Sequence, residues 1–266
     1  MYDRFNRKIN YLRISITDRC NLRCKYCMPA EGIKQINHKD ILTFEEIIEV
    51  VKVGVKLGID KVRITGGEPL VRKDIVDFIK MLSSVEGIKD LAMTTNGVYL
   101  EKYALKLSKA GLMRVNISLD TLDENKFKEL TRGGDVNDVL KGITAAQNAG
   151  FKPIKINCVV NNNSEEKDAK AVAEFCKQNG LNVRFIHLMD LHYGEFSVVE
   201  GGDGGNCGIC NRLRLTANGK IMPCLFNDIE YDVRNLGIEK AFISAIKNKP
   251  KCGTKSKSHE FYNIGG

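Results

Sequence analysis

Six apolar segments spread over residues 12–186 constrain the fold of this 266-residue chain more than any other feature. Each segment except the last is followed by a stretch with helical periodicity. Strands that alternate with helices are typical of a parallel sheet covered by helices. We therefore predict an α/β fold, an open, partial (β/α)6 barrel of the TIM type; periodicity alone leaves a doubly wound open sheet as the alternative. The predicted strands are residues 12–16, 61–65, 91–94, 114–119, 154–160 and 182–186.

The first predicted helix illustrates the local signals. Thr43 precedes Glu46 by three residues, which is the capping-box pattern at a helix start. Apolar residues then recur at helical spacing until Gly58 ends the helix. Further helices are predicted at residues 75–82, 105–110, 136–149 and 165–178.

The repeating pattern stops after residue 186. A glycine-rich link, which ends in the sequence GGDGG at residues 201–205, leads into a region without an evident strand–helix unit. We predict a barrel at residues 1–187, followed at residues 188–266 by the link and a small C-terminal region that holds a second metal centre.

The cysteine content and the net charge limit the cellular compartment and the kinds of partner that we expect for this protein. Nine cysteines, grouped in clusters, favour metal binding in a reducing cytosol over a disulfide framework. No run approaches the ~18 apolar residues of a membrane helix, and the N-terminus lacks a signal-peptide core, so we predict a cytoplasmic protein without membrane contact. The net charge of +8 suits an anionic partner. A nucleic-acid-binding zinc protein is disfavoured, because tryptophan is absent and aromatic residues make up only 7%.

The sequence CNLRCKYC at residues 20–27 places Cys20, Cys24 and Cys27 just after the first predicted strand. That position is the end of a barrel strand at which active-site residues gather. Closed zinc and all-cysteine iron–sulfur sites usually have four ligands. Three ligands suggest a [4Fe–4S] cluster with one iron open to a small molecule. A zinc site completed by a distant residue is the alternative, and spacing alone does not decide between them.

A second group of three cysteines lies in the C-terminal region: Cys207, Cys210 and Cys224. We predict a second open cluster there. The alternative is a zinc site closed by Cys252, which lies in a basic tail without the spacing of a partner. Cys158 and Cys176 fall in a predicted strand and a predicted helix, and we expect both to be small core residues.

Residues 18–29, DRCNLRCKYCMP, resemble the signature loop of the radical S-adenosylmethionine (SAM) superfamily. The resemblance implies that the three cysteines hold a [4Fe–4S] cluster whose open iron binds SAM, and that SAM is cleaved to a 5′-deoxyadenosyl radical. It also implies that Tyr26 lies near the adenine. The sequence GGEP, with Gly66, Gly67 and Glu68, resembles the motif that holds the amino group of SAM. By the same resemblance Thr94 lies along the cofactor and Ser118 contacts its methionine end.

Residues 210–226, CNRLRLTANGKIMPCLF, resemble the C-terminal cluster of the GTP 3′,8-cyclases, lyases that begin molybdenum-cofactor biosynthesis. This resemblance extends from Arg13 to the last residue. It implies a second [4Fe–4S] cluster that binds the guanine base, with Arg212 and Arg214 beside base and ribose. It further implies that the terminal Gly265 and Gly266 reach into the active site.

Several cations on the predicted strands suit the triphosphate of GTP, because burying a cation is costly without an anion. By resemblance the triphosphate contacts are Arg13, Lys61, Lys155 and Arg184. One departure is that the family carries a longer segment between Arg184 and Cys207. The alternative is therefore a radical SAM enzyme with an auxiliary cluster that acts on a peptide or another small anionic substrate. The electron donor and a homodimer are left open.

Overall fold

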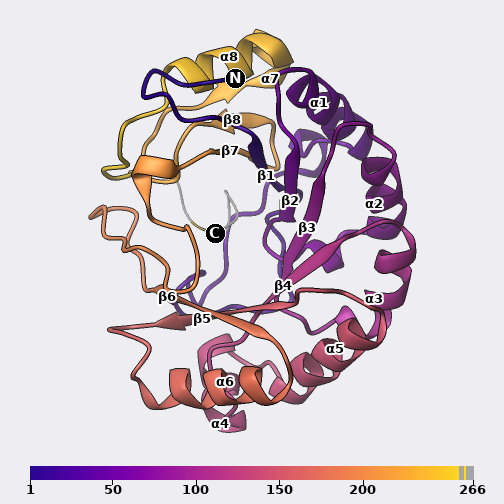
Figure 1. The fold of residues 1–266 in the computed structure, drawn as a ribbon, viewed down its shortest axis with the longest axis vertical. Coiled ribbons are helices and arrows are strands. Elements are labelled where there is room, and N and C mark those ends of the chain that lie inside the picture. The colour runs from indigo at the N-terminus through magenta and orange to yellow at the C-terminus, as the bar shows by residue number, and fades with distance from the viewer. Residues whose placement is uncertain (258–260, 262–266) are drawn as a thin grey trace.

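One curved sheet of nine strands organises the part of the chain that the computed structural model describes, residues 1–257 and 261. The strand order is β6-β5-β4-β3-β2-β1-β7-β8-β9, and the strands from β6 to β7 in this order run parallel. The sheet curves around an open interior, as expected for a partial barrel (Figure 1). The strands are β1 (Tyr11–Ser15), β2 (Lys61–Thr65), β3 (Asp90–Thr95), β4 (Arg114–Ser118), β5 (Lys155–Val160), β6 (Asn182–His187), β7 (Arg212–Leu215), β8 (Lys220–Met222) and β9 (Tyr231–Asp232).

The helices lie on the outer, convex side of the sheet (Figure 1). Between sheet and helices lies a continuous apolar core to which every parallel βα unit contributes. The predicted partial barrel is confirmed. The α-helices are α1 (Phe44–Lys56), α2 (Ile75–Ser83), α3 (Leu100–Lys109), α4 (Glu124–Thr131), α5 (Val136–Asn148), α6 (Lys167–Gln178), α7 (Val233–Leu236) and α8 (Ile238–Lys247). Short 3-10 helices span His38–Asp40, Pro69–Val71 and Cys207–Ile209.

The local sequence signals correspond closely to these elements. Thr43 and Glu46 form the predicted capping box: the Thr43 side chain accepts from the Glu46 amide, and the Glu46 side chain accepts from the Thr43 amide. Helix α4 had not been predicted, because its eight residues bury only Phe127 and Thr131 and therefore lack a broad apolar face. Cys158 and Cys176 are buried in the core, as expected. No helix in the described part of the chain is long and apolar enough to span a membrane.

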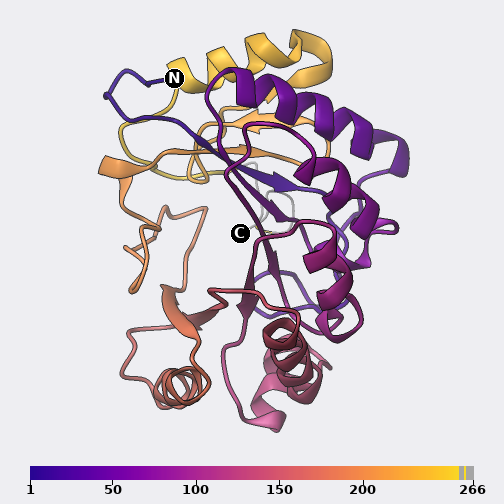
Figure 2. The same cartoon turned by 45° about the vertical axis from the view of Figure 1, so that its right-hand side comes forward.

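The C-terminal region extends the sheet beyond β1. Strand β7 pairs with β1 in parallel, and β8 and β9 continue the sheet antiparallel. Helix α8 covers this extension and lies beside α1 (Figure 2). The buried ring of Phe242 packs against Gly54 so closely that a Cβ there would lie 3.0 Å from the ring. The division of the chain at residues 187 and 188 stays a prediction; strands from both sides of it share one sheet.

The link between β6 and the second group of cysteines folds back along the edge strand. Backbone hydrogen bonds join Phe185 and Glu200 in both directions, at 3.1 Å each. The Phe196 ring stacks on that of Phe226 with centroids 4.4 Å apart, so the link packs against the loop that follows β8. The short link therefore contacts β6 through Glu200 and the C-terminal region through Phe196.

Candidate active site

A cavity of about 470 Å³ opens on the inner, concave face of the sheet. The pairing register places Arg214, Arg13 and Arg63 side by side on β7, β1 and β2. All the predicted substrate residues line the cavity. So do Arg63, another of the strand cations that suit a triphosphate, and Arg114, which the sequence analysis had not named. The cationic lining comprises Arg13, Lys61, Arg63, Arg114, Lys155, Arg184, Arg212, Arg214 and Lys249.

Burial and neighbouring positive charges lower the pKa values of several of these cationic side chains. Burial, and then the neighbouring charge of Arg212, lowers the pKa of Arg214 to about 10. The pKa of Lys155 is lowered by burial and by Arg184 and Arg114, and the pKa of Arg184 is lowered by burial and by Arg63. Like charges held together in a poorly solvated cavity repel one another, so an anion that enters between them is stabilised.

Several buried polar atoms around the cavity lack a hydrogen-bond partner among the described residues. They include the Nε atoms of Arg63 and Arg184, the Thr94 hydroxyl, both amide atoms of Asn116 and the Asn157 oxygen. Buried polar groups are rarely left unpaired in folded proteins. These atoms belong to neighbouring strands and all their residues line one cavity, so they suit a polar ligand bound there.

The first cysteine group lies in the loop after β1, and neighbouring loops support it. The Leu22 amide donates to Cys20 Sγ at 3.4 Å, and the Asn96 side chain donates to the same sulfur at 3.8 Å. Burial raises the pKa of Cys20 to about 11 and the pKa values of Cys24 and Cys27 to about 12. Without a metal, these thiols stay protonated at neutral pH.

The GGEP loop packs directly against the first cysteine loop. A Cβ at Gly67 would lie only 2.3 Å from the Arg19 carbonyl oxygen, so glycine is required for this approach. The buried Glu68 carboxylate accepts from the Leu70 and Asn96 amides and from the Thr95 hydroxyl, at 2.7–3.0 Å. Burial raises the pKa of Glu68 to about 7, against these hydrogen bonds. The loop after β2 thus joins the loops after β1 and β3, which places the predicted SAM-binding residues at one end of the sheet.

Tyr26, the aromatic residue before the third cysteine, is oriented by a carboxylate. Its hydroxyl donates to Asp120 Oδ2 at 2.8 Å, and Asp120 Oδ1 accepts from the Val159 amide. Ser118 ends β4 and Thr94 lies near the end of β3. Of the predicted cofactor residues only Thr94 lines the large cavity, so the first cysteine loop borders a different part of the interior.

The second cysteine group opens directly into the cavity. Cys207 and Cys210 flank a short 3-10 helix, and Cys224 follows β8. Burial alone would raise the pKa of Cys210, but the charges of Lys249 and Arg212 outweigh burial and bring it to about 7. This group therefore lies in more cationic surroundings than the first.

The position of Cys252 corrects the sequence analysis. Cys252 Sγ lies 2.6 Å from Cys207 Sγ, although the two residues are 45 positions apart. Sequence spacing had given Cys252 no partner, because the contact depends on the fold of the C-terminal segment over the second group. The predicted catalytic Gly265 and Gly266 lie outside the described residues.

Each cysteine group offers three thiols as its donor set. Within residues 1–257 and 261, no three Cys, His, Asp or Glu side chains meet closely enough to hold one metal ion. A single zinc ion needs its sulfur ligands within ~4 Å of one another, given Zn–S distances of about 2.3 Å. A [4Fe–4S] cluster gives each cysteine its own iron, so its three ligands need not converge on one point.

Comparisons with known proteins show the family of this chain. A family model described as the radical SAM superfamily matches residues 14–176. A GTP 3′,8-cyclase of Alkaliphilus oremlandii (strain OhILAs) is 44% identical over 314 aligned positions, which cover all of this chain and 98% of that protein. The chain belongs to the radical SAM superfamily and, within it, to the GTP 3′,8-cyclase family. Membership in the superfamily implies a [4Fe–4S] cluster and SAM.

Further relatives extend the comparison. A GTP 3′,8-cyclase of Thermodesulfovibrio yellowstonii (strain ATCC 51303 / DSM 11347 / YP87) is 43% identical and covers 94% of this chain and 95% of that protein. The structure of Streptococcus suis SuiB bound to S-adenosylmethionine shares the fold with a TM-score of 0.62 at 18% identity, over 92% of this chain and 64% of that one. The 314 aligned positions of the first relative exceed the 266 residues of this chain, so that cyclase has residues without a counterpart here.

Proposed function

We propose that this protein is a radical SAM GTP 3′,8-cyclase that abstracts H3′ of GTP and joins C3′ to C8 in the first step of molybdopterin synthesis. The observation that carries the proposal is the shared cavity: the second cysteine group and the cationic strand residues line the same space. A guanine base at one end and a triphosphate at the other match these two kinds of lining.

Each cysteine group has its own role in the proposal. Cys20, Cys24 and Cys27 hold the cluster that binds SAM, while Cys207, Cys210 and Cys224 hold a second cluster beside the base. When bound, the first cluster and SAM supply the 5′-deoxyadenosyl radical that removes the hydrogen atom. The chain orients these groups: Gly67, Glu68 and Asn96 hold the first cysteine loop, and Asp120 holds Tyr26, which belongs to that loop.

The cations are assigned to the substrate. Arg13, Lys61, Lys155 and Arg184 bind the triphosphate. The Nε of Arg184, which has no hydrogen-bond partner among the described residues, lies beside Gly202 of the link. Arg212 and Arg214 lie nearer the second cysteine group, where they would donate hydrogen bonds to the intermediate formed on the base and assist its protonation, while the electron that reduces it would come from the electron donor. The net positive lining favours GTP over a peptide substrate. The catalytic role of Gly265 and Gly266 stays a prediction.

The shortened link still encloses the substrate. Met189, Phe196 and Val199 from the link line the cavity together with residues 202–206. The bridge between Phe185 and Glu200 holds the link beside β6. The link therefore supplies a wall on the side where this chain is shorter than the family pattern.

An isotope-transfer experiment tests the proposed reaction. The reconstituted protein is incubated without oxygen with dithionite, SAM and GTP that carries deuterium at C3′. We expect 5′-deoxyadenosine to gain one deuterium, because the radical removes H3′, and mass spectrometry measures the gain. GTP deuterated at C8 is the control. Turnover that leaves the deuterium of C3′ in the nucleotide would contradict the proposal.

Iron analysis tests the metal centres. We expect about eight irons per chain after anaerobic reconstitution, because each of two clusters contributes four. Cys252→Ser should keep both clusters if Cys207, Cys210 and Cys224 suffice as ligands. A loss of about four irons in that variant would show that Cys252 closes the second site, and stoichiometric zinc in the wild-type chain would exclude the second cluster.

A further inference from the structure

The segment from Lys249 to Gly253 contacts every cysteine of the second group through a different residue. The Lys249 ammonium lies close enough to Cys210 for its positive charge to lower the pKa of that thiol. Cys252 Sγ lies 2.6 Å from Cys207 Sγ, and a Cβ at Gly253 would lie 3.0 Å from Cys224 Sγ. The segment therefore forms a support for the whole group, although it follows the last of the three cysteines by 25 positions.

Lys249 is the buried centre of this support. Lys249 is only 1% exposed, and its ammonium donates to the Arg212 carbonyl at 2.7 Å and to the Pro223 carbonyl at 2.6 Å. Arg212 follows Cys210 by two residues, and Pro223 directly precedes Cys224. One side chain thus joins the two loops that carry these cysteines. The titratable groups that raise its pKa most strongly, against the lowering by burial, are Cys210 and Cys224.

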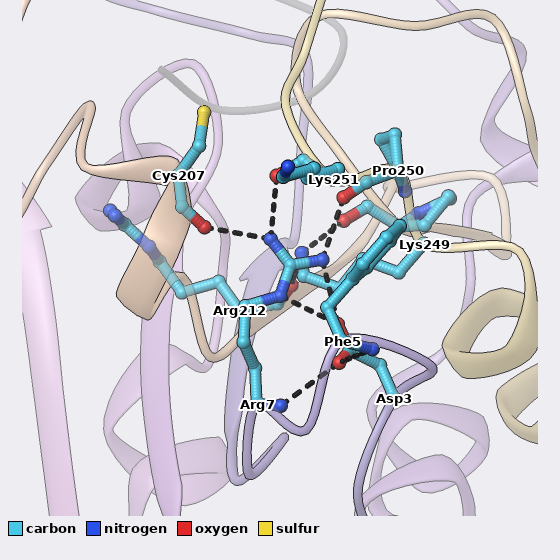
Figure 3. Close-up of polar contacts among 9 residues, drawn as sticks. Asp3, Phe5, Arg7, Cys207, Arg212, Lys249, Pro250 and Lys251 are labelled. Carbon is cyan, nitrogen blue, oxygen red and sulfur yellow. Dashed lines mark hydrogen bonds and ion pairs between the residues drawn. The ribbon is translucent and has the colours of Figure 1, made fainter.

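Arg7 holds the same segment from the N-terminal side (Figure 3). Its guanidinium donates to the carbonyls of Cys207, Pro250 and Lys251 at 2.6–2.9 Å. The buried Asp3 carboxylate accepts from Arg7 Nε at 2.7 Å and neutralises it. Because Arg7 is already paired with Asp3, the cations that balance charge at Cys210 and Cys224 are Lys249, Arg212 and Arg214.

We propose that Lys249 is a positioning residue of the second metal centre: its ammonium fixes the Cys210 and Cys224 loops and places a positive charge beside the cluster's sulfur ligands. This assignment rests on the proposed function, specifically on a cluster at the second group. Reduction adds a negative charge to a cluster, and a nearby buried cation stabilises that charge. Hydrogen bonds and charge around the sulfurs are known to set cluster potentials. Lys249 therefore raises the reduction potential of the second cluster.

The test measures the second cluster alone. A full-length variant with Cys20, Cys24 and Cys27 changed to Ala removes the first cluster and its signal. In this background we compare the protein that keeps Lys249 with two variants. Lys249→Gln removes the charge but keeps hydrogen-bond donors, and Lys249→Met keeps only the approximate size of the side chain. The matched control is Lys220→Met on β8, because Lys220 pairs with Asp232 at 2.7 Å and lies outside the cavity lining. Iron content and a redox titration followed by electron paramagnetic resonance are the readouts.

We expect both Lys249 variants to shift the midpoint potential of the second cluster to more negative values, and Lys249→Met also to lose iron. Lys220→Met should have the same potential and iron content as the triple-alanine protein with Lys249 unchanged. Unchanged iron and potential in both variants, or an equal shift in Lys220→Met, would overturn the assignment. Each substitution is also made in the otherwise wild-type chain, where SAM cleavage shows whether the protein still folds. If both Lys249 variants lose SAM cleavage, Lys249 is required for folding in general, and the assignment is overturned. If the parent background itself holds no iron, the second cluster of the proposed function is rejected instead.

Discussion

Cys24→Ala is expected to abolish reductive cleavage of SAM, whereas Cys210→Ala is expected to retain it. The reason is the separation of the two cysteine groups. Cys24 lies in the loop after β1, and Cys210 lines the large cavity that does not include the first loop. A cluster that lacks one of three cysteine ligands loses the iron site at which SAM binds. The measurement is 5′-deoxyadenosine formed with dithionite under anaerobic conditions.

The Cys210→Ala protein provides its own control, because iron content distinguishes loss of one cluster from loss of both. Cys176→Ala is the matched control for removal of a thiol, since Cys176 is a core residue of α6 away from both groups. If Cys24→Ala and Cys210→Ala cleave SAM at the same rate, the assignment of SAM to the first group is wrong.

Lys155→Ala and Arg184→Ala are each expected to weaken GTP binding about ten- to hundredfold. Hydrogen bonds to charged groups contribute roughly 1.5–3 kcal/mol, and every 1.4 kcal/mol changes affinity about tenfold. Both side chains line the cavity, and burial followed by the charge of neighbouring cations lowers the pKa of each, so a bound phosphate also relieves their repulsion. Anaerobic titration calorimetry with GTP measures the effect, and SAM cleavage should persist.

Two controls separate phosphate binding from a general effect of charge. Lys170→Ala removes a cation from the exposed face of α6, where Lys170 pairs with Glu165, and it should leave GTP affinity unchanged. Arg184→Lys keeps the charge and should bind GTP better than Arg184→Ala. Guanosine lacks the triphosphate and should bind weakly to every variant; wild-type affinity for guanosine equal to that for GTP would show that these cations are not a triphosphate site.

Much of the barrel could be predicted because its signals are local. Each strand from β1 to β6 carries an apolar run, and α1 begins at a capping box that four residues define. Strands β7, β8 and β9 contain four, three and two residues, which is too short for a recognisable alternation. Their place in the sheet depends on pairing between β1 and β7, about 200 positions apart, and no local pattern records such a pairing.

The same distinction holds for the candidate site. The sequence alone identified two cysteine groups as candidate ligand sets, because CxxxCxxC and the cysteines around CNRLRL are local motifs, but their spacing left zinc as an alternative. Only the tertiary structure placed Arg63 beside Arg13, brought Cys252 to Cys207 and buried Lys249 between two cysteine loops. Local sequence controls backbone preference and short-range ligand spacing. Contacts between distant residues arise only when the sheet forms and curves, and packing brings their side chains into the same small volume.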